Sequence, residues 1–182
     1  MKPVEKKLIR DCIDGNRKSQ EELYKLYAGK MFLVCMRYSK EQQEAEDILQ
    51  ESFIKIFKQL KSFKGESSLF FWMKRIVINT ALNSQRSKLY LFPMVDVNEM
   101  KEETSQSSEP SDYSMEELMN MINKLPQSSR IIFNLYAVEG YKHHEIADML
   151  KISIGTSKSQ YARAKQLLRE QMTDISHKYG QG

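Results

Sequence analysis

Apolar residues recur at spacings of three and four through the first half of the chain, which is typical of amphipathic helices. Three such patterns cover residues 23–38, 41–60 and 69–88. Ser19 followed by Glu22 has the spacing of a capping box, so we expect it to begin the first of these helices. The first half of the chain is therefore predicted to be a group of long helices.

The second half repeats the helical spacing in shorter pieces. Ser114 and Glu117 form a second potential capping box, and Pro126 is expected to stop or restart the helix that follows it. Further helical patterns cover residues 131–138, 143–150 and, after a short turn, 154–172. The last two patterns predict a helix, a tight turn and a second helix.

Residues 93–112 differ from both halves in composition. This segment holds six acidic residues and one basic residue, and it has no aromatic residue. Such a segment buries too little apolar surface to offset the entropy of ordering it, so we interpret it as a flexible acidic linker. We therefore expect an all-α protein with two small helical domains, residues 1–92 and 113–182, of which the second contains a helix-turn-helix.

Length and composition exclude several classes of protein. The 182 residues contain two cysteines, which is too few for a disulfide scaffold and favours reduced, partly buried thiols. No apolar run is long enough to span a bilayer, and the N-terminus lacks the apolar core of a signal peptide. We expect a cytoplasmic protein with no membrane insertion.

The last predicted helix has a polar and basic side. Thr156, Ser159, Gln160 and Arg163 follow one another at short helical spacings, with Lys158 and Lys165 beside them. Amide and guanidinium groups can read base edges in a major groove, while lysines neutralise flanking phosphates. The alternative is a helical hairpin whose basic side is merely solvated.

A second candidate for nucleic-acid binding covers residues 63–88. It combines aromatic, amide and basic side chains, and single-stranded nucleic acid is bound by stacking surfaces beside phosphate-neutralising groups. The alternative is that the aromatic residues belong to the core. For Trp72 the two interpretations are nearly balanced, since an aromatic residue on a helix more often packs than stacks on a base.

Enzyme chemistry finds little support in the sequence. His143 and His144 are adjacent, so they point to different sides of a helix and cannot chelate a metal as a pair four residues apart would. The acidic cluster in residues 41–51 has no histidine partner or glycine-rich loop nearby, and no phosphate-binding or zinc-binding motif is present. We expect no enzymatic activity, no catalytic residues, no cofactor and no metal.

Two motifs in one chain resemble a known family. The segments AEDILQESFIKIFKQLKSFKGESSLFFWMKRIVINTALN and GYKHHEIADMLKISIGTSKSQYARAKQLL are similar to regions 2 and 4 of the extracytoplasmic-function sigma factors of bacterial RNA polymerase, group IV of the housekeeping-sigma superfamily. The resemblance implies a transcription initiation factor that binds core RNA polymerase and promoter DNA. It also makes an anti-sigma factor a possible partner.

The resemblance assigns roles to individual residues. It implies that the contacts to core polymerase are Asp47, Gln50 and Glu51. It implies that the contacts to minus-ten DNA are Phe63, Lys64, Ser67, Ser68, Trp72, Arg75 and Asn79. Contacts to minus-35 DNA are expected at Thr156, Lys158, Ser159, Gln160, Arg163 and Lys165.

This chain departs from the family at three positions of the recognition helix. Family members often carry an aliphatic residue at the position of Ser157, an arginine at that of Gln160 and a leucine at that of Tyr161. These departures put the base preference in question rather than the fold.

The alternative function is a helix-turn-helix regulator whose N-terminal half senses a ligand or dimerises.

Overall fold

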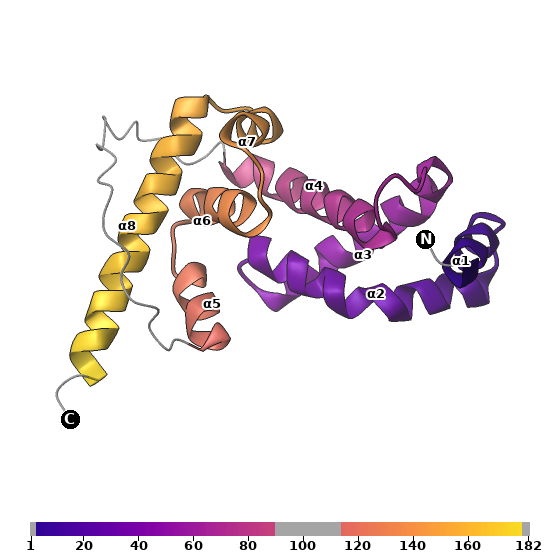
Figure 1. Cartoon of the computed structure of the whole chain (residues 1–182), viewed down its shortest axis with the longest axis horizontal. Helices are drawn as coiled ribbons and strands as arrows, with labels where there is room; N and C mark the ends of the chain where they lie inside the picture. Colours follow the sequence, from indigo (N-terminus) through magenta and orange to yellow (C-terminus); the bar gives the residue numbers. More distant parts are fainter. Residues whose placement is uncertain (1–2, 90–113, 180–182) are drawn as a thin grey trace. The chain divides into compact units, whose positions relative to one another are not determined.

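The computed structural model describes residues 3–89 and 114–179, and the regular secondary structure within them is entirely helical (Figure 1). The chain divides into two compact units, Met1–Lys88 and Leu89–Gly182. The prediction of an all-α protein with two domains is confirmed. The predicted linker at 93–112 lies outside the described residues.

Three long helices and one short helix form the first unit. They are α1 (Pro3–Ile13), α2 (Arg17–Tyr38), α3 (Gln42–Gln59) and α4 (Leu69–Leu89), with a single 3-10 turn, η1 (Leu60–Ser62), after α3. Figure 1 shows α2 and α3 running side by side, and α1 also packs against α2. The sequence did not predict α1.

The core of this unit is formed by the inner sides of these helices. Its largest fully buried side chains are Leu23, Met31, Tyr38, Ile48, Ile56, Leu60, Leu69, Met73 and Ile78. These residues come from α2, α3, η1 and α4, so their burial fixes which side of each helix faces solvent. The polar sides of α3 and α4 are therefore free to contact partners.

The start of α2 differs from the prediction. The helix begins at Arg17 and its N-cap is Asn16, whose side-chain oxygen accepts a hydrogen bond from the Ser19 backbone N–H at 3.1 Å. The expected capping box of Ser19 and Glu22 is therefore wrong. Asparagine is as good an N-cap residue as serine, and the positive φ of Gly15 (84°) turns the chain just before it.

Both cysteines are free and buried, as expected. Burial raises the pKa of Cys12 to about 11, with a smaller contribution from the neighbouring Asp11 carboxylate, and it raises the pKa of Cys35 to about 12. Both thiols are therefore protonated and unreactive at neutral pH.

The second unit consists of shorter helices around one long helix. They are α5 (Met115–Asn123), α6 (Gln127–Phe133), the π-helical turn η2 (Asn134–Val138), α7 (His143–Leu150) and α8 (Ile154–Tyr179). The capping box at the start of α5 is confirmed: Ser114 Oγ accepts from the Glu117 N–H at 3.2 Å, and Glu117 accepts from the Ser114 N–H at 2.9 Å. Pro126 is the N-cap of α6, so the predicted restart is confirmed.

The turn between α7 and α8 sets the angle of the helix-turn-helix. Lys151 adopts a left-handed conformation with φ 59°, and the Ile152 N–H donates to the Ala147 carbonyl at 3.1 Å. Ser153 Oγ then accepts from the Thr156 N–H at 2.9 Å and caps α8. These contacts confirm the predicted turn and position the first turns of α8.

Candidate protein and nucleic-acid interfaces

The outward side of α3 carries the three residues expected to contact polymerase. Asp47, Gln50 and Glu51 are all exposed, and their spacings of three and four place them on one side of the helix. The opposite side buries Ile48 and Leu49 among other residues. We call this set, Asp47, Gln50 and Glu51, the acidic face.

The carboxylates of the acidic face make only weak contacts with neighbouring side chains. Glu51 accepts from the Lys55 ammonium group at 2.6 Å, and both side chains are partly exposed, so this pair contributes little to stability. Lys55 also donates to Thr80 Oγ1 on α4 at 3.3 Å, while Asp47 receives a long contact of 3.5 Å from Gln43. A hollow of about 450 Å³ lies beside these carboxylates and is bounded across from α3 by Ser84.

The region from the end of η1 to the middle of α4 carries the second predicted set. Phe63 and Trp72 pack on one another with ring centroids 5.4 Å apart and a tilt of 51°, and both are half-buried. The interpretation of Trp72 as a packed residue is therefore correct for one part of its ring. The other part remains open to solvent.

The polar residues between these two rings are exposed. Lys64, Ser67 and Ser68 lie on a loop that turns at Gly65, whose φ is 76°. Ser68 Oγ accepts from the Phe71 N–H at 3.4 Å, so the predicted cap of α4 by a serine is confirmed. The loop thus presents a lysine and two hydroxyl groups beside the partly open indole.

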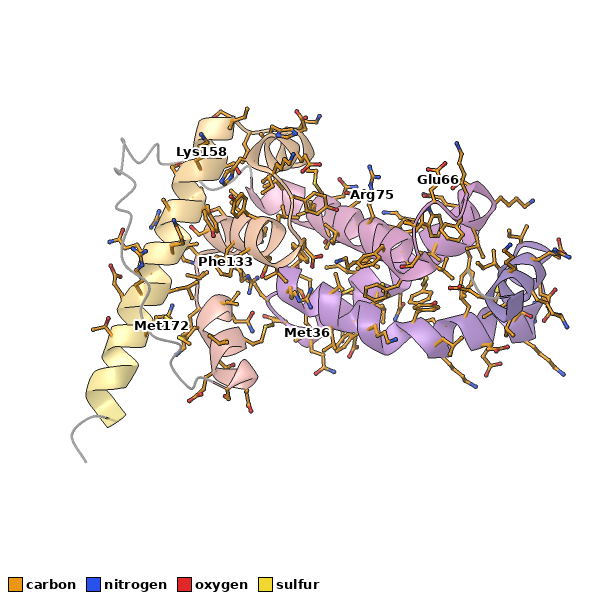
Figure 2. All side chains as sticks on the ribbon, viewed as in Figure 1. Met36, Glu66, Arg75, Phe133, Lys158 and Met172 are labelled. Carbon is orange, nitrogen blue, oxygen red and sulfur yellow. The ribbon has the colours of Figure 1, made fainter. Side chains whose placement is uncertain are left out.

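Arg75 and Asn79 lie on the exposed side of α4, one turn apart and in line with Trp72. Figure 2 shows the Arg75 side chain extending away from the helix. The structure therefore brings together the aromatic ring, the guanidinium group and the amide that the sequence placed in one element. Such a set offers stacking, charge neutralisation and hydrogen bonding on a single helix.

One residue of this region was left out of the predicted set. Phe71 is 58% exposed, and the Lys74 ammonium group lies 5.2 Å from the centre of its ring. The exposed ring is an additional stacking surface at the start of α4. Its neighbours Phe70 and Trp72 are half-buried, so only the structure distinguishes it from them.

The start of α8 carries most of the third predicted set. Lys158 is exposed, Ser159 and Arg163 are half-exposed one turn apart, and Figure 2 shows Lys158 near the beginning of the helix. The Lys165 ammonium group lies 5.2 Å from the centre of the Tyr161 ring. Thr156 Oγ1 lies 2.8 Å from Ser153 Oγ in the cap of the helix.

Gln160, which was expected in this set, is buried and does not lie on the exposed side of α8. Only 4% of its surface is exposed, and its side-chain oxygen accepts from Ser129 Oγ at 2.7 Å and from Ser128 Oγ at 3.2 Å. The side of α8 that carries Gln160 packs against the start of α6, where those serines lie. Gln160 therefore joins the two helices and does not face solvent.

The other two departures from the family pattern are also used inside the domain. Ser157 is fully buried, and its Oγ lies 2.9 Å from Nδ1 of His143 at the start of α7. The ring of Tyr161 lies 4.5 Å from that of Tyr136 and stacks on Phe133 at 6.0 Å, and burial raises the pKa of its hydroxyl. Polar and aromatic contacts thus hold α8 against α6, η2 and α7.

Within residues 3–89 and 114–179, no group of His, Cys, Asp or Glu residues is arranged to hold a metal ion. No helix in the same ranges is long and apolar enough to cross a membrane.

Comparison with known proteins identifies both units. The family model "Sigma-70 region 2" matches residues 23–89, and "Sigma-70, region 4" matches residues 115–168. An ECF RNA polymerase sigma-E factor of Haemophilus influenzae is 24% identical over 180 residues, covering 92% of this chain and 95% of that protein. Its Escherichia coli K12 counterpart is 28% identical over 173 residues, covering 88% and 90%.

A solved structure supports the fold independently. The sigma factor RpoE of Bartonella quintana, crystallised with the anti-sigma factor NepR, superimposes with a TM-score of 0.52 at 20% identity, covering 84% of this chain and 96% of that one. Both sigma regions are therefore present in one all-α chain, in the same order as in these relatives. The chain belongs to the extracytoplasmic-function sigma factors, which bind core RNA polymerase and direct it to promoters.

Proposed function

We propose that the two domains divide promoter-directed initiation between them, with residues 1–92 binding core polymerase and minus-ten DNA, residues 113–182 binding minus-35 DNA, and residues 93–112 serving as the linker. The observation that carries this proposal is the separate clustering of exposed residues. Carboxylates gather on α3, an aromatic and basic set on α4, and basic residues at the start of α8. Their different chemistry fits a protein partner and two different states of DNA.

The acidic face is the proposed contact to core polymerase. Asp47 and Glu51 are exposed, and their contacts with Gln43 and Lys55 are on the same helix, so a basic surface can exchange for those contacts at small cost. Photo-crosslinking tests this assignment directly. A photoreactive residue at Gln50 should crosslink to core polymerase, whereas one at Lys158 should crosslink to duplex DNA upstream of the start site. Crosslinking of both positions to DNA would contradict the proposed division.

The loop at 63–68 and the first half of α4 are the proposed minus-ten element, through Phe63, Lys64, Ser67, Ser68, Trp72, Arg75 and Asn79. The half-exposed indole and the exposed Phe71 offer surfaces on which unpaired bases can stack. Arg75 and Asn79 supply charge and hydrogen bonds beside them. Opening of DNA would then be driven by capturing unstacked bases, with no nucleotide hydrolysis.

Replacing Asn79 and Trp72 separates DNA contact from packing. Asn79→Ala should leave polymerase binding and the melting temperature unchanged but reduce open-complex formation, because the exposed amide has no packing role. Trp72→Ala should reduce opening and also destabilise the domain by about 1–2 kcal/mol, less than for a fully buried aromatic residue, because the ring packs on Phe63.

Permanganate footprinting of unpaired thymines, with thermal melting in parallel, checks this pair of variants. Exposed Asn83, on the same helix, is the control, and Asn83→Ala should open promoters normally. If Asn79→Ala also opened promoters normally, Asn79 would be removed from the proposed element.

The start of α8 is the proposed minus-35 contact, through Thr156, Lys158, Ser159, Arg163 and Lys165. Gln160 is left out because it is buried against Ser129. Among these residues Arg163 has the planar guanidinium group that best matches the two acceptors of guanine, and we assign the lysines to phosphates. Base preference at this element is therefore expected to depend on Arg163.

Truncating Arg163 and truncating Lys165 should impair initiation in different ways. Arg163→Ala should lower initiation and flatten the preference at one or two minus-35 positions, because a bidentate base contact gives about 1–3 kcal/mol of discrimination. Lys165→Ala should weaken all promoters alike and reduce the salt dependence by about one phosphate contact. Initiation on a randomised minus-35 library at several salt concentrations measures both effects. Identical uniform losses would make Arg163 a phosphate contact.

Three further features of the proposal follow from the family. The chain acts without enzymatic activity of its own, it works in the cytoplasm with the polymerase, and it can be bound by an anti-sigma factor. RpoE of Bartonella quintana was crystallised with such a protein. The chain can be purified from cells of its source, and the proteins bound to it can be identified in the fractions that contain core polymerase and in those that lack it. A protein other than core polymerase that is bound to the chain would be the candidate anti-sigma factor.

A further inference from the structure

The outward side of α3 carries one large apolar residue among its charged ones. Ile54 is 55% exposed and follows Glu51, Gln50 and Asp47 by three, four and seven residues, so it lies on the same side of the helix. The other large aliphatic residues of α3 are buried, namely Ile48, Leu49 and Ile56. Ile54 therefore adds little to the core of the domain.

Ile54 lies in the middle of this exposed side. Gln50 and exposed Lys58 lie one turn before and one turn after it, and Glu51 lies three residues before it. A β-branched residue is a slightly unfavourable choice for an exposed helical position, and it brings no solubility. Its surroundings match the layout of protein interfaces, in which an apolar centre is enclosed by a polar rim.

We propose that Ile54 is the apolar anchor of the polymerase-binding surface and inserts into an apolar recess on a basic surface of core RNA polymerase. This inference rests on the proposed role of the acidic face. The carboxylates around Ile54 would pair with basic groups at the edge of that recess. The surface thus joins charge with one buried side chain.

The two components should act on different steps of binding. Exposed carboxylates attract a basic partner from a distance, so they speed association, and salt weakens their effect. Burial of an aliphatic side chain has no such salt dependence and mainly slows dissociation. The contribution of Ile54 should therefore persist at salt concentrations where that of Asp47 declines.

The test is binding of the full chain to purified core polymerase, measured as association and dissociation rates at low and high salt. Ile54→Ala should raise Kd about tenfold, mostly through faster dissociation and by the same factor at both salt concentrations. Ile54→Leu should restore most of the affinity. The matched control is Leu33→Ala on α2, since Leu33 is 62% exposed, and this variant should bind like the wild type.

The charge variant Asp47→Asn separates this inference from the proposed function. Its loss of affinity should shrink at high salt, whereas the loss for Ile54→Ala should not. Normal binding by Ile54→Ala beside weak binding by Asp47→Asn would overturn the anchor and leave the acidic face in place. Normal binding by both would overturn the acidic face and the anchor with it. Equal losses for Ile54→Ala and Leu33→Ala would overturn the anchor as well.

Discussion

Reversing two charges on α3, Asp47→Arg with Glu51→Arg, is expected to abolish transcription directed by this factor and to weaken binding to core polymerase at least about a hundredfold. Like charges placed against a basic surface cost several kcal/mol, which is far more than the loss of two exposed ion pairs. The domain itself should stay folded. Both carboxylates are exposed, and the pair of Glu51 with Lys55 contributes less than about 1 kcal/mol.

The chain offers a matched control for this double variant. Glu21 and Glu22 on α2 are also exposed, and Glu21 pairs with Lys25 in the same four-residue spacing that joins Glu51 to Lys55. Glu21→Arg with Glu22→Arg makes the same change of net charge on another helix. It should bind and transcribe nearly normally. Equal losses from the two double variants would mean that total charge matters and that the acidic face is no specific site.

Gln160→Leu is expected to destabilise the second domain by about 1–3 kcal/mol, because it leaves the buried Ser129 hydroxyl without its acceptor. For a domain of this size that loss corresponds to a fall in melting temperature of roughly 4–8 °C for each kcal/mol. Adding Ser129→Ala removes the stranded hydroxyl and should recover much of the loss. Both partners are then apolar, which is nearly neutral when the shape is kept.

Two optical signals separate the domains in that experiment. The chain has one tryptophan, Trp72, which lies on α4 in the first domain, so its fluorescence reports unfolding there alone. Gln160→Leu should leave that transition unchanged and lower the transition seen by circular dichroism. Promoter preference should be kept in the variant with Ser129→Ala. A change of preferred minus-35 base without loss of stability would instead show that Gln160 reads DNA.

Helical periodicity was enough to predict which side of α3 faces solvent. The buried residues Ile48 and Ile56 are eight residues apart, which is about two turns of the helix. The exposed residues Asp47 and Glu51 are four residues apart, which is about one turn. The prediction succeeded because α3 packs with one side only. Burial and exposure then alternate as a single stripe, which a sequence displays directly.

Helical periodicity did not predict the burial of Gln160, a polar residue that is covered by other polar residues. Gln160 lies beside the half-exposed Ser159 and three residues before the half-exposed Arg163, and nothing local shows that Ser128 and Ser129 lie opposite it. Those serines are more than thirty residues away in sequence. Long-range hydrogen bonds of this kind are set by packing, so the sequence alone could not predict that Gln160 is buried.

The other differences between the sequence predictions and the structure concern the N-cap of α2 and the aromatic residues at the start of α4. Asn16 caps α2 where Ser19 was expected, because both residue types are good caps and only the backbone geometry decides between them. Trp72 was open to two interpretations, and it is half-buried, so each is correct for part of the ring. Phe71, Phe70 and Trp72 look equivalent in sequence, but their exposure differs with their position around α4.

Run-off transcription with purified core polymerase is the most direct test of the central claim that this chain recognises promoters for RNA polymerase. Core enzyme, the chain and a library of promoter fragments from its source are combined, and the transcripts are sequenced. We expect discrete start sites that appear only when both proteins are present and that share a minus-ten and a minus-35 element. The account would be contradicted if the chain alone bound duplex DNA specifically and if no transcripts appeared after core polymerase was supplied. That result would favour a helix-turn-helix regulator.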